Sequence, residues 1–324
     1  LLVTGGTEMT WTTYNPIKQM AAHYADKVSD SDVVIPTTDP EAWNLFDEYR
    51  WVYDKMTICA SQGLTYGPIG TNPTEYPVCV KPITNLLGGS IKSQVCHSLE
   101  QYQQITDPGL FWSPYHMGEH YSFDFIMARG QVVESFILRG EKLQHGAFDY
   151  WELITEMDVS ESIYRHAHNW LETHLDNYTG CINVEAIGNY IIEVQLRMGD
   201  IDRFGDPTLM QAIHDLYASG QWDWEAGEHF PDQFYLAALF AQPNTTFSYN
   251  PNLINKICED LVYYQIDDPN QYHCNPAHGV RVALFCDDSW DAVSRARNLV
   301  VALMKPDIDG RYVDCLQDYE ELRI

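Results

Sequence analysis

The sequence predicts an α+β fold with a mostly antiparallel sheet, and three observations lead to this prediction. Strand-like segments and hairpins alternate with helices along the middle of the chain. Hydrophobic residues make up 45% of the chain and aromatic residues 13%, so a large core can form despite a formal net charge of -27. The length of 324 residues predicts two or three domains.

Residues 1–50 are predicted to form a short α/β region. A brief apolar run begins at Leu1 and enters Gly5-Gly6, a helix-like stretch follows, and a second strand is expected at 32–35. Asp39-Pro40 is a helix-start signal in which Asp39 serves as the N-cap. The apolar spacing beyond it predicts a helix, carried by the side chains Trp43, Phe46, Tyr49, Tyr53 and Met56.

Residues 51–220 are predicted to form the central domain. Strands and hairpins alternate with helices along this part, and one helix is expected around 160–175. The mixture of hairpins and helices predicts an α+β domain rather than a parallel sheet. The predicted strands are 78–81, 122–128, 132–138, 182–185 and 190–195.

Residues 221–324 are predicted to form a small C-terminal α+β domain. It opens with an irregular connection over 222–231, followed by a strand at 279–286 and a helix at 288–304. Aromatic side chains gather at the start of this part, and we interpret them as packing residues rather than as a ligand cage. They are Trp222, Trp224, Phe230 and Phe234.

The charge and the composition exclude several functions. With 46 Asp and Glu against 19 Lys and Arg, the chain repels phosphate backbones, so we expect neither nucleic acid nor a membrane surface as a partner. We find no apolar run long enough to span a membrane and no signal peptide, which predicts a cytoplasmic protein. A salt-adapted protein remains an alternative explanation of the acidity, although eight cysteines do not favour it.

The cysteines include no CxxC pair, and several lie in apolar, strand-like contexts. We interpret them as buried free thiols in a reducing compartment, with disulfides as the alternative. Two short His/Cys groups could suggest a metal site, but neither has the paired spacing of structural zinc, and packing histidines are the simpler explanation. These groups are His166 with His168, and His273-Cys274 with His278.

A first candidate site combines lysines with a glycine-rich segment. Lys55 follows Asp54 at a helix start, Lys81 ends a predicted strand, and Lys92 lies just beyond Gly88-Gly89-Ser90. Glycine lets backbone N–H groups approach phosphate oxygens, and lysines supply the positive charge. Each piece alone is more simply a hairpin turn or a solvent-exposed lysine; their order along the chain favours a phosphate site.

A second candidate site lies on a predicted hairpin and consists of Glu185, Glu193, Gln195 and Arg197. Mg²⁺ prefers hard oxygen ligands and usually takes one or two carboxylates. A three-residue turn over 187–189 places Glu185 diagonally beside Glu193, and we predict this form. A two-residue turn would send the two glutamates to opposite faces, and the metal hypothesis would then fail. The simpler alternative is a solvated acidic surface.

The order of these segments resembles the ATP-grasp superfamily, in particular carbamoyl-phosphate synthetase, biotin carboxylase and glycinamide ribonucleotide synthetase. The resemblance covers about 52–205 and rests on four weak motifs in the right order, with a fifth hint in the tail. Segments 53–56 and 63–68 resemble the family's Asp-Lys helix and the loop after it. Segments 76–82 with 88–90, 115–124, and 183–185 with 192–197 resemble its lysine strand and Gly-Gly-Ser loop, its central strand, and its metal-binding strands.

The resemblance implies an ATP-grasp fold, in which two α+β subdomains grip ATP, and it implies roles for individual residues. Lys55 and Lys81 would bind the ATP phosphates, and the loop Gly88, Gly89 and Ser90 would cover them. The hinge at Trp112, Ser113 and Tyr115 would meet adenine through its backbone, and Glu119 belongs to the implied nucleotide site. Glu185, Glu193 and Gln195 would hold Mg²⁺, with Mn²⁺ as an alternative, and Arg197 and Lys81 would be catalytic.

The implied activity is an ATP-dependent ligase that phosphorylates a carboxylate, releases ADP and joins the acyl group to an amine. Its partners would be the two small-molecule substrates; a homodimer is compatible with the sequence. The alternative is a catalytically inactive nucleotide-binding or interaction protein, for which Pro114 and His120 are the best evidence among three departures from the family pattern. Gln195 replaces an Asn, Ser113-Pro114 replaces a hinge that offers a glutamate, and His120 occupies a usually acidic position.

Overall fold

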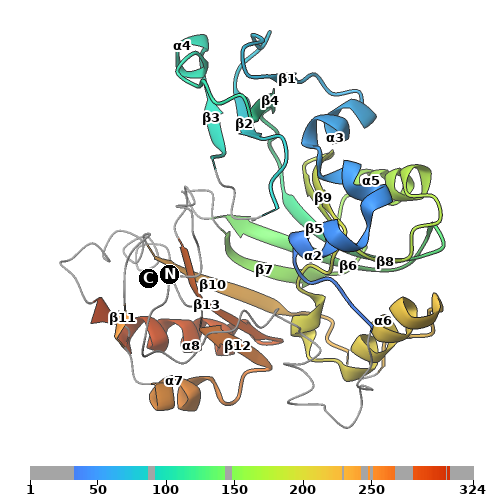
Figure 1. The fold of residues 1–324 in the computed structure, drawn as a ribbon. Helices are drawn as coiled ribbons and strands as arrows, with labels where there is room; N and C mark the ends of the chain where they lie inside the picture. The colour runs from blue at the N-terminus through green and yellow to red at the C-terminus, as the bar shows by residue number, and fades with distance from the viewer. Residues whose placement is uncertain are drawn as a thin grey trace, which may run out of the picture.

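The computed structural model describes residues 33–86, 92–142, 148–227, 230–241, 247–248, 251–266, 280–303 and 305–306. A four-stranded sheet of order β1-β4-β2-β3 lies above an eight-stranded sheet of order β12-β13-β10-β7-β6-β5-β8-β9 (Figure 1). A two-stranded sheet pairs β11 (Phe247–Ser248) with β14 (Lys305–Pro306). Every strand pairing among the described residues is antiparallel, which confirms the predicted α+β class.

The small sheet has its own core. It consists of β1 (Gly67–Pro68), β2 (Val78–Pro82), β3 (Gln94–Cys96) and β4 (Leu110–Pro114), with the short helix α4 (Leu99–Tyr102) beside it. Trp112 anchors this core because its indole Nε1 donates to the carbonyl oxygen of Thr71 at 2.8 Å. The buried side chains are Val78, Val80, Cys96, Tyr102, Leu110 and Trp112.

The large sheet unites the predicted central and C-terminal parts of the chain. Strands β10 and β13 pair with each other, and β10 also pairs with β7, so the tail extends the sheet of the central part. The predicted boundaries at 50 and 220 remain predictions. The strands are β5 (His120–Ala128), β6 (Gln131–Lys142), β7 (Phe148–Ile154), β8 (Gly180–Ile187), β9 (Tyr190–Gln195), β10 (Tyr235–Ala241), β12 (Tyr263–Ile266) and β13 (Val280–Asp287).

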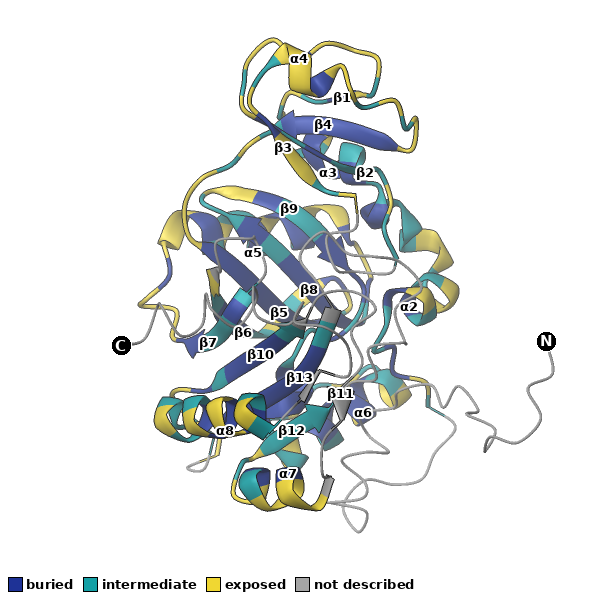
Figure 2. Cartoon of the chain, turned by 90° about the vertical axis from the view of Figure 1, so that its left-hand side faces the viewer, coloured by how far each residue is buried: buried dark blue, intermediate teal, exposed yellow. Residues whose placement is uncertain are grey.

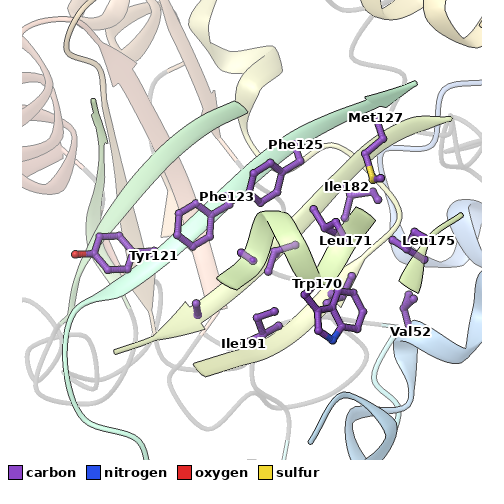
Figure 3. Close-up of a cluster of buried hydrophobic side chains, with 14 of the residues drawn as sticks. Val52, Tyr121, Phe123, Phe125, Met127, Trp170, Leu171, Leu175, Ile182 and Ile191 are labelled. Carbon is purple, nitrogen blue, oxygen red and sulfur yellow. The ribbon is translucent and has the colours of Figure 1, made fainter. Parts of the chain in front are cut away.

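Helices cover both faces of the large sheet. Successive side chains of a strand point to opposite faces, and in this sheet both faces carry apolar side chains that need to be covered. Phe123 and Phe125 of β5 point toward α5 (Glu161–His174), in the cluster shown in Figure 3. Ile126 of the same strand points the other way, toward the 3-10 helix η2 (Ile201–Phe204) and α6 (Pro207–Ser219). A third cluster lies under α7 (Pro251–Cys258) and α8 (Trp290–Leu303). Figure 2 shows that much of β5, β8 and β10 is buried.

The helix predicted after residue 39 is three shorter helices. These are α2 (Asp39–Leu45), the 3-10 helix η1 (Asp47–Tyr53) and α3 (Lys55–Ser61). The non-helical backbone of Phe46, with φ of -117° and ψ of 65°, separates the first two. Asp54 caps α3 by accepting hydrogen bonds from the N–H groups of Met56 and Thr57.

Two further predictions for this region are wrong. Residues 33–35 form no strand, while residues 1–32, with the first predicted strand and helix, lie outside the described residues. The N-cap of α2 is Thr38 rather than Asp39, since Thr38 forms a capping box with Glu41. Asp39 is the first helical residue, and its carboxylate is buried against Arg197. A residue with a distant charged partner was therefore mistaken for a local cap.

The remaining sequence predictions for the fold agree with the structure. The predicted strands and the two longer helices are present within a few residues of their expected ends. The six described cysteines form no disulfide, and Cys274 and Cys315 lie outside the described residues. The aromatic cluster predicted at 222–234 packs against β6 and η2. Within the described segments, the helices are too short or too polar to cross a lipid bilayer.

Candidate functional site

Two glutamates face each other on neighbouring strands at the edge of the large sheet. Glu185 of β8 is paired directly with Glu193 of β9, so the two side chains share one face. The predicted three-residue turn is wrong, because Ile187 pairs with Tyr190 and the turn has two residues. A β-bulge in β9 absorbs one extra residue between Ile191 and Glu193 and restores the common face.

Cationic or hydrogen-bonding side chains offset the repulsion between these like-charged neighbours. The Lys55 Nζ lies 2.9 Å from Glu193 Oε1, and the His120 Nε2 lies 3.2 Å from Glu185 Oε2. Lys55 is only 5% exposed and begins α3, whose N-cap Asp54 fixes its position. The Glu185 and Glu193 side chains are 26% and 20% exposed, which leaves part of each open to a ligand.

The surroundings of Glu185 favour its ionised form. Burial alone would raise its pKa, but the hydrogen bond and charge of His120, with the charges of Arg197 and Lys55, hold the pKa below its usual range. An ionised carboxylate is the form that binds metal cations.

Gln195 and Arg197 continue the same polar row. The Gln195 amide donates to Glu193 Oε1 at 3.2 Å, and its Oε1 accepts a hydrogen bond from the Arg197 guanidinium. A carbonyl oxygen has two lone pairs, so this contact leaves one of them for a second partner. Arg197 also donates to Asp39 Oδ1 at 3.0 Å and to the carbonyl oxygen of Met198 at 2.7 Å. The guanidinium is therefore held in place on three sides.

The Asp39–Arg197 pair is nearly withdrawn from water. Asp39 is 4% exposed, and the Arg197 side chain is 20% exposed. Burial raises the pKa of Asp39, while the charge of Arg197 opposes that rise. Burial would lower the pKa of Arg197, but Asp39 and Asp200 together raise it, so the guanidinium stays charged.

Lys81 connects the small sheet to the large one. It lies in β2, and its Nζ donates to the carbonyl oxygen of Ile192 in β9 at 3.1 Å. The ammonium also lies 5.9 Å from the centre of the Phe111 ring. Lys55 and Lys81 therefore both contact β9, at adjacent residues.

The predicted hinge runs along the end of β4. Trp112 and Ser113 pair with Val80 and Cys79 of β2, and the N–H of Tyr115 donates to the carbonyl oxygen of Pro77 at 3.2 Å. These groups serve the small sheet. Beyond them, the ring of His116 stacks on Tyr190 at 4.3 Å between ring centres. Burial, with Lys81 nearby, lowers the pKa of His116 to about 4, so this ring is neutral near pH 7.

Other predicted residues lie apart from this row. Glu119 is largely exposed and accepts a hydrogen bond from Tyr121, with Arg139 at 3.8 Å. Gly88, Gly89 and Ser90 lie outside the described residues. Lys92 forms an exposed ion pair with Asp107 at 2.6 Å.

Three functional candidates were missed by sequence reasoning, namely Asp39, Asp124 and Asn183. Asn183 donates to Asp124 Oδ1 at 3.0 Å, and Asp124 also accepts from the N–H groups of Gly199 and Asp200. Burial raises the pKa of Asp124 to about 7, against the lowering effect of the Asn183 hydrogen bond. Asp124 and Asn183 point to the same face of the sheet as Glu185. Because alternate residues of a strand share a face, the position of Asn183 two residues before Glu185 could have identified it as a candidate.

Two cavities lie beside β6 and β7; the first extends to the loops before α5 and α8, and the second extends to the start of β5. Their volumes are about 590 and 550 Å³, and both are lined by Arg139 and Glu152, which form an ion pair at 2.8 Å. Among the proposed site residues only Glu119 lines either cavity, next to His120. No group of three His, Cys, Asp or Glu side chains in the described ranges is arranged around a common metal position, and His166 instead contacts Gln62.

Comparison with known proteins identifies the fold. No family model and no curated protein sequence matches this chain. An L-amino acid ligase from Bacillus licheniformis matches 91% of this chain and 84% of its own, with a TM-score of 0.60 and 12% identity. A carboxyaminoimidazole ribonucleotide synthase from Aspergillus clavatus, solved with ATP, covers 78% of this chain and 72% of its own, with a TM-score of 0.53 and 11% identity.

A phosphoribosylamine–glycine ligase from Thermotoga maritima covers 89% of this chain and 86% of its own, with a TM-score of 0.53 and 11% identity. In this chain a small antiparallel sheet lies above a large one, and the glutamate pair lies on the large sheet. The class is thus a two-sheet α+β fold that holds its candidate site where the sheets meet. The chain therefore has the ATP-grasp fold of these neighbours.

Proposed function

We propose that the protein is an ATP-dependent ligase that activates a carboxylate and joins it to an amine. The observation that carries this proposal is the directly opposed pair Glu185 and Glu193, with Lys55 at 2.9 Å and Lys81 contacting the same strand. Two carboxylates and two lysines beside one strand can bind a polyphosphate together with its metal ion. The similar solved structures are ligases, which supports the same general class for this chain.

The residues present suit Mg²⁺. Glu185 and Glu193 offer hard, partly exposed carboxylate oxygens, and Gln195 offers an amide oxygen with a free lone pair. Mg²⁺ usually combines one or two carboxylates with phosphate oxygens and water, so this set is sufficient, and Mn²⁺ accepts the same ligands. When bound, the metal ion would neutralise charge on the β- and γ-phosphates.

The lysines and the arginine would provide the remaining positive charge. Each ammonium has three donors, so Lys55 can keep Glu193 and still reach a phosphate oxygen. Lys81 would exchange the Ile192 carbonyl for a phosphate oxygen. Arg197 uses three of its five N–H groups on protein atoms, and the other two would hold the transferred phosphoryl group.

The adenine moiety would lie beside the segment 115–118, because the backbone of β4 before it is already paired. Gly88, Gly89 and Ser90 would cover the phosphates, and Glu119 would complete the nucleotide site. These assignments rest on the resemblance of the motifs to those of the ATP-grasp family.

The reaction needs positioning and charge neutralisation rather than a nucleophilic side chain. An oxygen of the substrate carboxylate would bond to the γ-phosphorus as the bond from that phosphorus to the bridging oxygen breaks, giving an acyl phosphate and ADP. The amine nitrogen would then attack the acyl carbon and lose a proton as phosphate leaves. The chain contributes Lys55, Lys81 and Arg197 as fixed positive groups, which stabilise the charge that develops on the phosphoryl oxygens.

An assay of nucleotide products tests this proposal. Purified protein with Mg-ATP and a panel of carboxylates and amines should release ADP and phosphate only when both substrates are present. Lys81→Ala should abolish turnover, while Lys92→Ala, which removes an exposed pair with Asp107, should leave it intact. Release of AMP would indicate an adenylate mechanism instead, and turnover by Lys81→Ala would refute the proposed role of Lys81.

A catalytically inactive nucleotide-binding protein is the second candidate. It is favoured by the fact that both glutamates already have partners in the structure, Lys55 for Glu193 and His120 for Glu185. In that case these charged side chains would stabilise the fold and would have no catalytic role. Nucleotide binding by calorimetry without any product release across the panel would support this alternative.

A further inference from the structure

His120 occupies an unusual position beside the glutamate pair. It begins β5, and its ring lies diagonally across from Glu185, since Ser122 pairs with Glu185 and His120 with Ile187. Its Nε2 lies 3.2 Å from Glu185 Oε2, and the residue is 5% exposed. A ring nitrogen that faces an ionised carboxylate acts as the donor, so Nε2 carries the proton in this contact.

Aromatic side chains fix the orientation of this ring. Phe148 and Trp151 of β7 meet His120 edge to face, at 4.9 and 5.5 Å between ring centres. Gly140 of β6, paired with His120, leaves the space for them, because a Cβ there would lie 2.7 Å from both aromatic rings. The imidazole therefore cannot rotate freely, and its Nε2 is held on the Glu185 side.

The other ring nitrogen shows that His120 does more than fill space. Its Nδ1 is buried and has no hydrogen-bond partner among the described residues. A buried polar atom without a partner destabilises a fold, whereas an apolar side chain of similar size would pack against Phe148 and Trp151 without that cost. The contact between His120 and Glu185 is the interaction that offsets the cost of burying Nδ1.

We propose that His120 is a positioning residue for the metal site: its Nε2–H holds Glu185 Oε2, which leaves Oε1 directed toward the cation that Glu185 and Glu193 share. This inference rests on the proposed function, because it assigns His120 a role at the same metal site. Groups that hydrogen-bond to metal ligands fix the orientation of those ligands, and losing them typically lowers metal affinity tenfold or more.

Two substitutions separate this role from a packing role. The side-chain amide of His120→Gln places an N–H donor near the position of Nε2, whereas that of His120→Asn places it near Nδ1. Mn²⁺ binding is then measured by electron paramagnetic resonance in the presence of ADP, which requires no turnover. We expect the Kd for Mn²⁺ to rise about tenfold in His120→Asn and less than about threefold in His120→Gln. Binding of metal-free ADP in EDTA should be unchanged in both.

The matched control is the pair of variants His168→Asn and His168→Gln. His168 also lies beside a glutamate, Glu172 at 3.8 Å, but on α5 and away from the site. Neither control should change Mn²⁺ binding. If His120→Asn and His120→Gln lost the same Mn²⁺ affinity, or if neither lost any, the inference about His120 would be overturned. Mn²⁺ binding by the wild-type protein would still support the proposed function in that case. Absence of Mn²⁺ binding in the wild-type protein would overturn both.

Discussion

The buried pair between Asp39 and Arg197 allows a sharp test of how the candidate site is held together. We consider Asp39→Ala, which removes a carboxylate that is 4% exposed and lies 3.0 Å from the Arg197 Nε. Removing one partner of a buried ion pair leaves the other charge uncompensated, which typically costs about 3–5 kcal/mol. Because the Arg197 side chain is 20% exposed and keeps two other acceptors, we expect the lower end, about 3 kcal/mol.

Thermal and urea denaturation would measure this loss. At about 2 °C per kcal/mol for a chain of this size, the Tm should fall by about 6 °C. The control is Asp47→Ala, since Asp47 also begins a helical segment but is exposed, and its loss should stay within about 0.5 kcal/mol. The double variant Asp39→Ala/Arg197→Met should lose clearly less than the sum of the single variants. If Asp39→Ala were no less stable than Asp47→Ala, the pair would not hold Arg197.

Three further predictions concern the segments around the site. Because burial lowers the pKa of His116 to about 4 from 6.5, the unfolded chain takes up this proton first and stability falls as the pH drops from 6.5 to 4. His116→Gln should reduce that slope by at most about 1.4 kcal/mol per pH unit in urea titrations. Gly118→Ala should destabilise the fold by more than about 2 kcal/mol in denaturation, since φ is +126° and a Cβ would lie 2.9 Å from the Gly188 backbone. Lys55→Met should lower ATP affinity at least tenfold in calorimetry, because it removes the buried cation beside Glu193.

Each of these predictions has a matched comparison in the chain. His97→Gln changes an exposed histidine, and an equal effect on the pH slope would rule out the burial argument. Gly63 has φ of +70° with open space around it, so Gly63→Ala should cost only about 1 kcal/mol; an equal loss would show that the contact with Gly188 is unimportant. Lys92→Met should not affect ATP binding, and comparable losses in both lysine variants would remove Lys55 from the proposed site.

Local patterns predicted the strands better than the contacts between them. Alternation along 190–195 predicted β9 with its correct ends, because one face of that strand packs in the core. It did not reveal the β-bulge, because Ile191 and Ile192 are both apolar and the sequence does not show which of them faces the core. The prediction that the two glutamates share a face was therefore correct, but the turn on which it was based was wrong.

Contacts between residues far apart in the sequence are the part of the candidate site that could not be predicted. Asp39 and Arg197 are 158 positions apart, and no local signal connects them. Strand β7 was missed because the charged residues inside it, Asp149 and Glu152, weaken its apolar pattern; in the structure they pair with Arg297 and Arg139. A charged residue within a buried strand is explained only by its partner, which sequence alone does not supply.

The order of the chain determines how the small sheet can move. Helix α3 packs on β9, and the side chain of Gln62 exchanges two hydrogen bonds with the backbone of Ile191 before the chain leaves for the small sheet. The chain returns through Gly118 to β5. The small sheet is therefore an insertion attached at both ends, with Gly63 in the outgoing connection and Gly118 in the returning one. A rotation of the small sheet about the line that joins these two connections would carry Lys81 toward or away from β9.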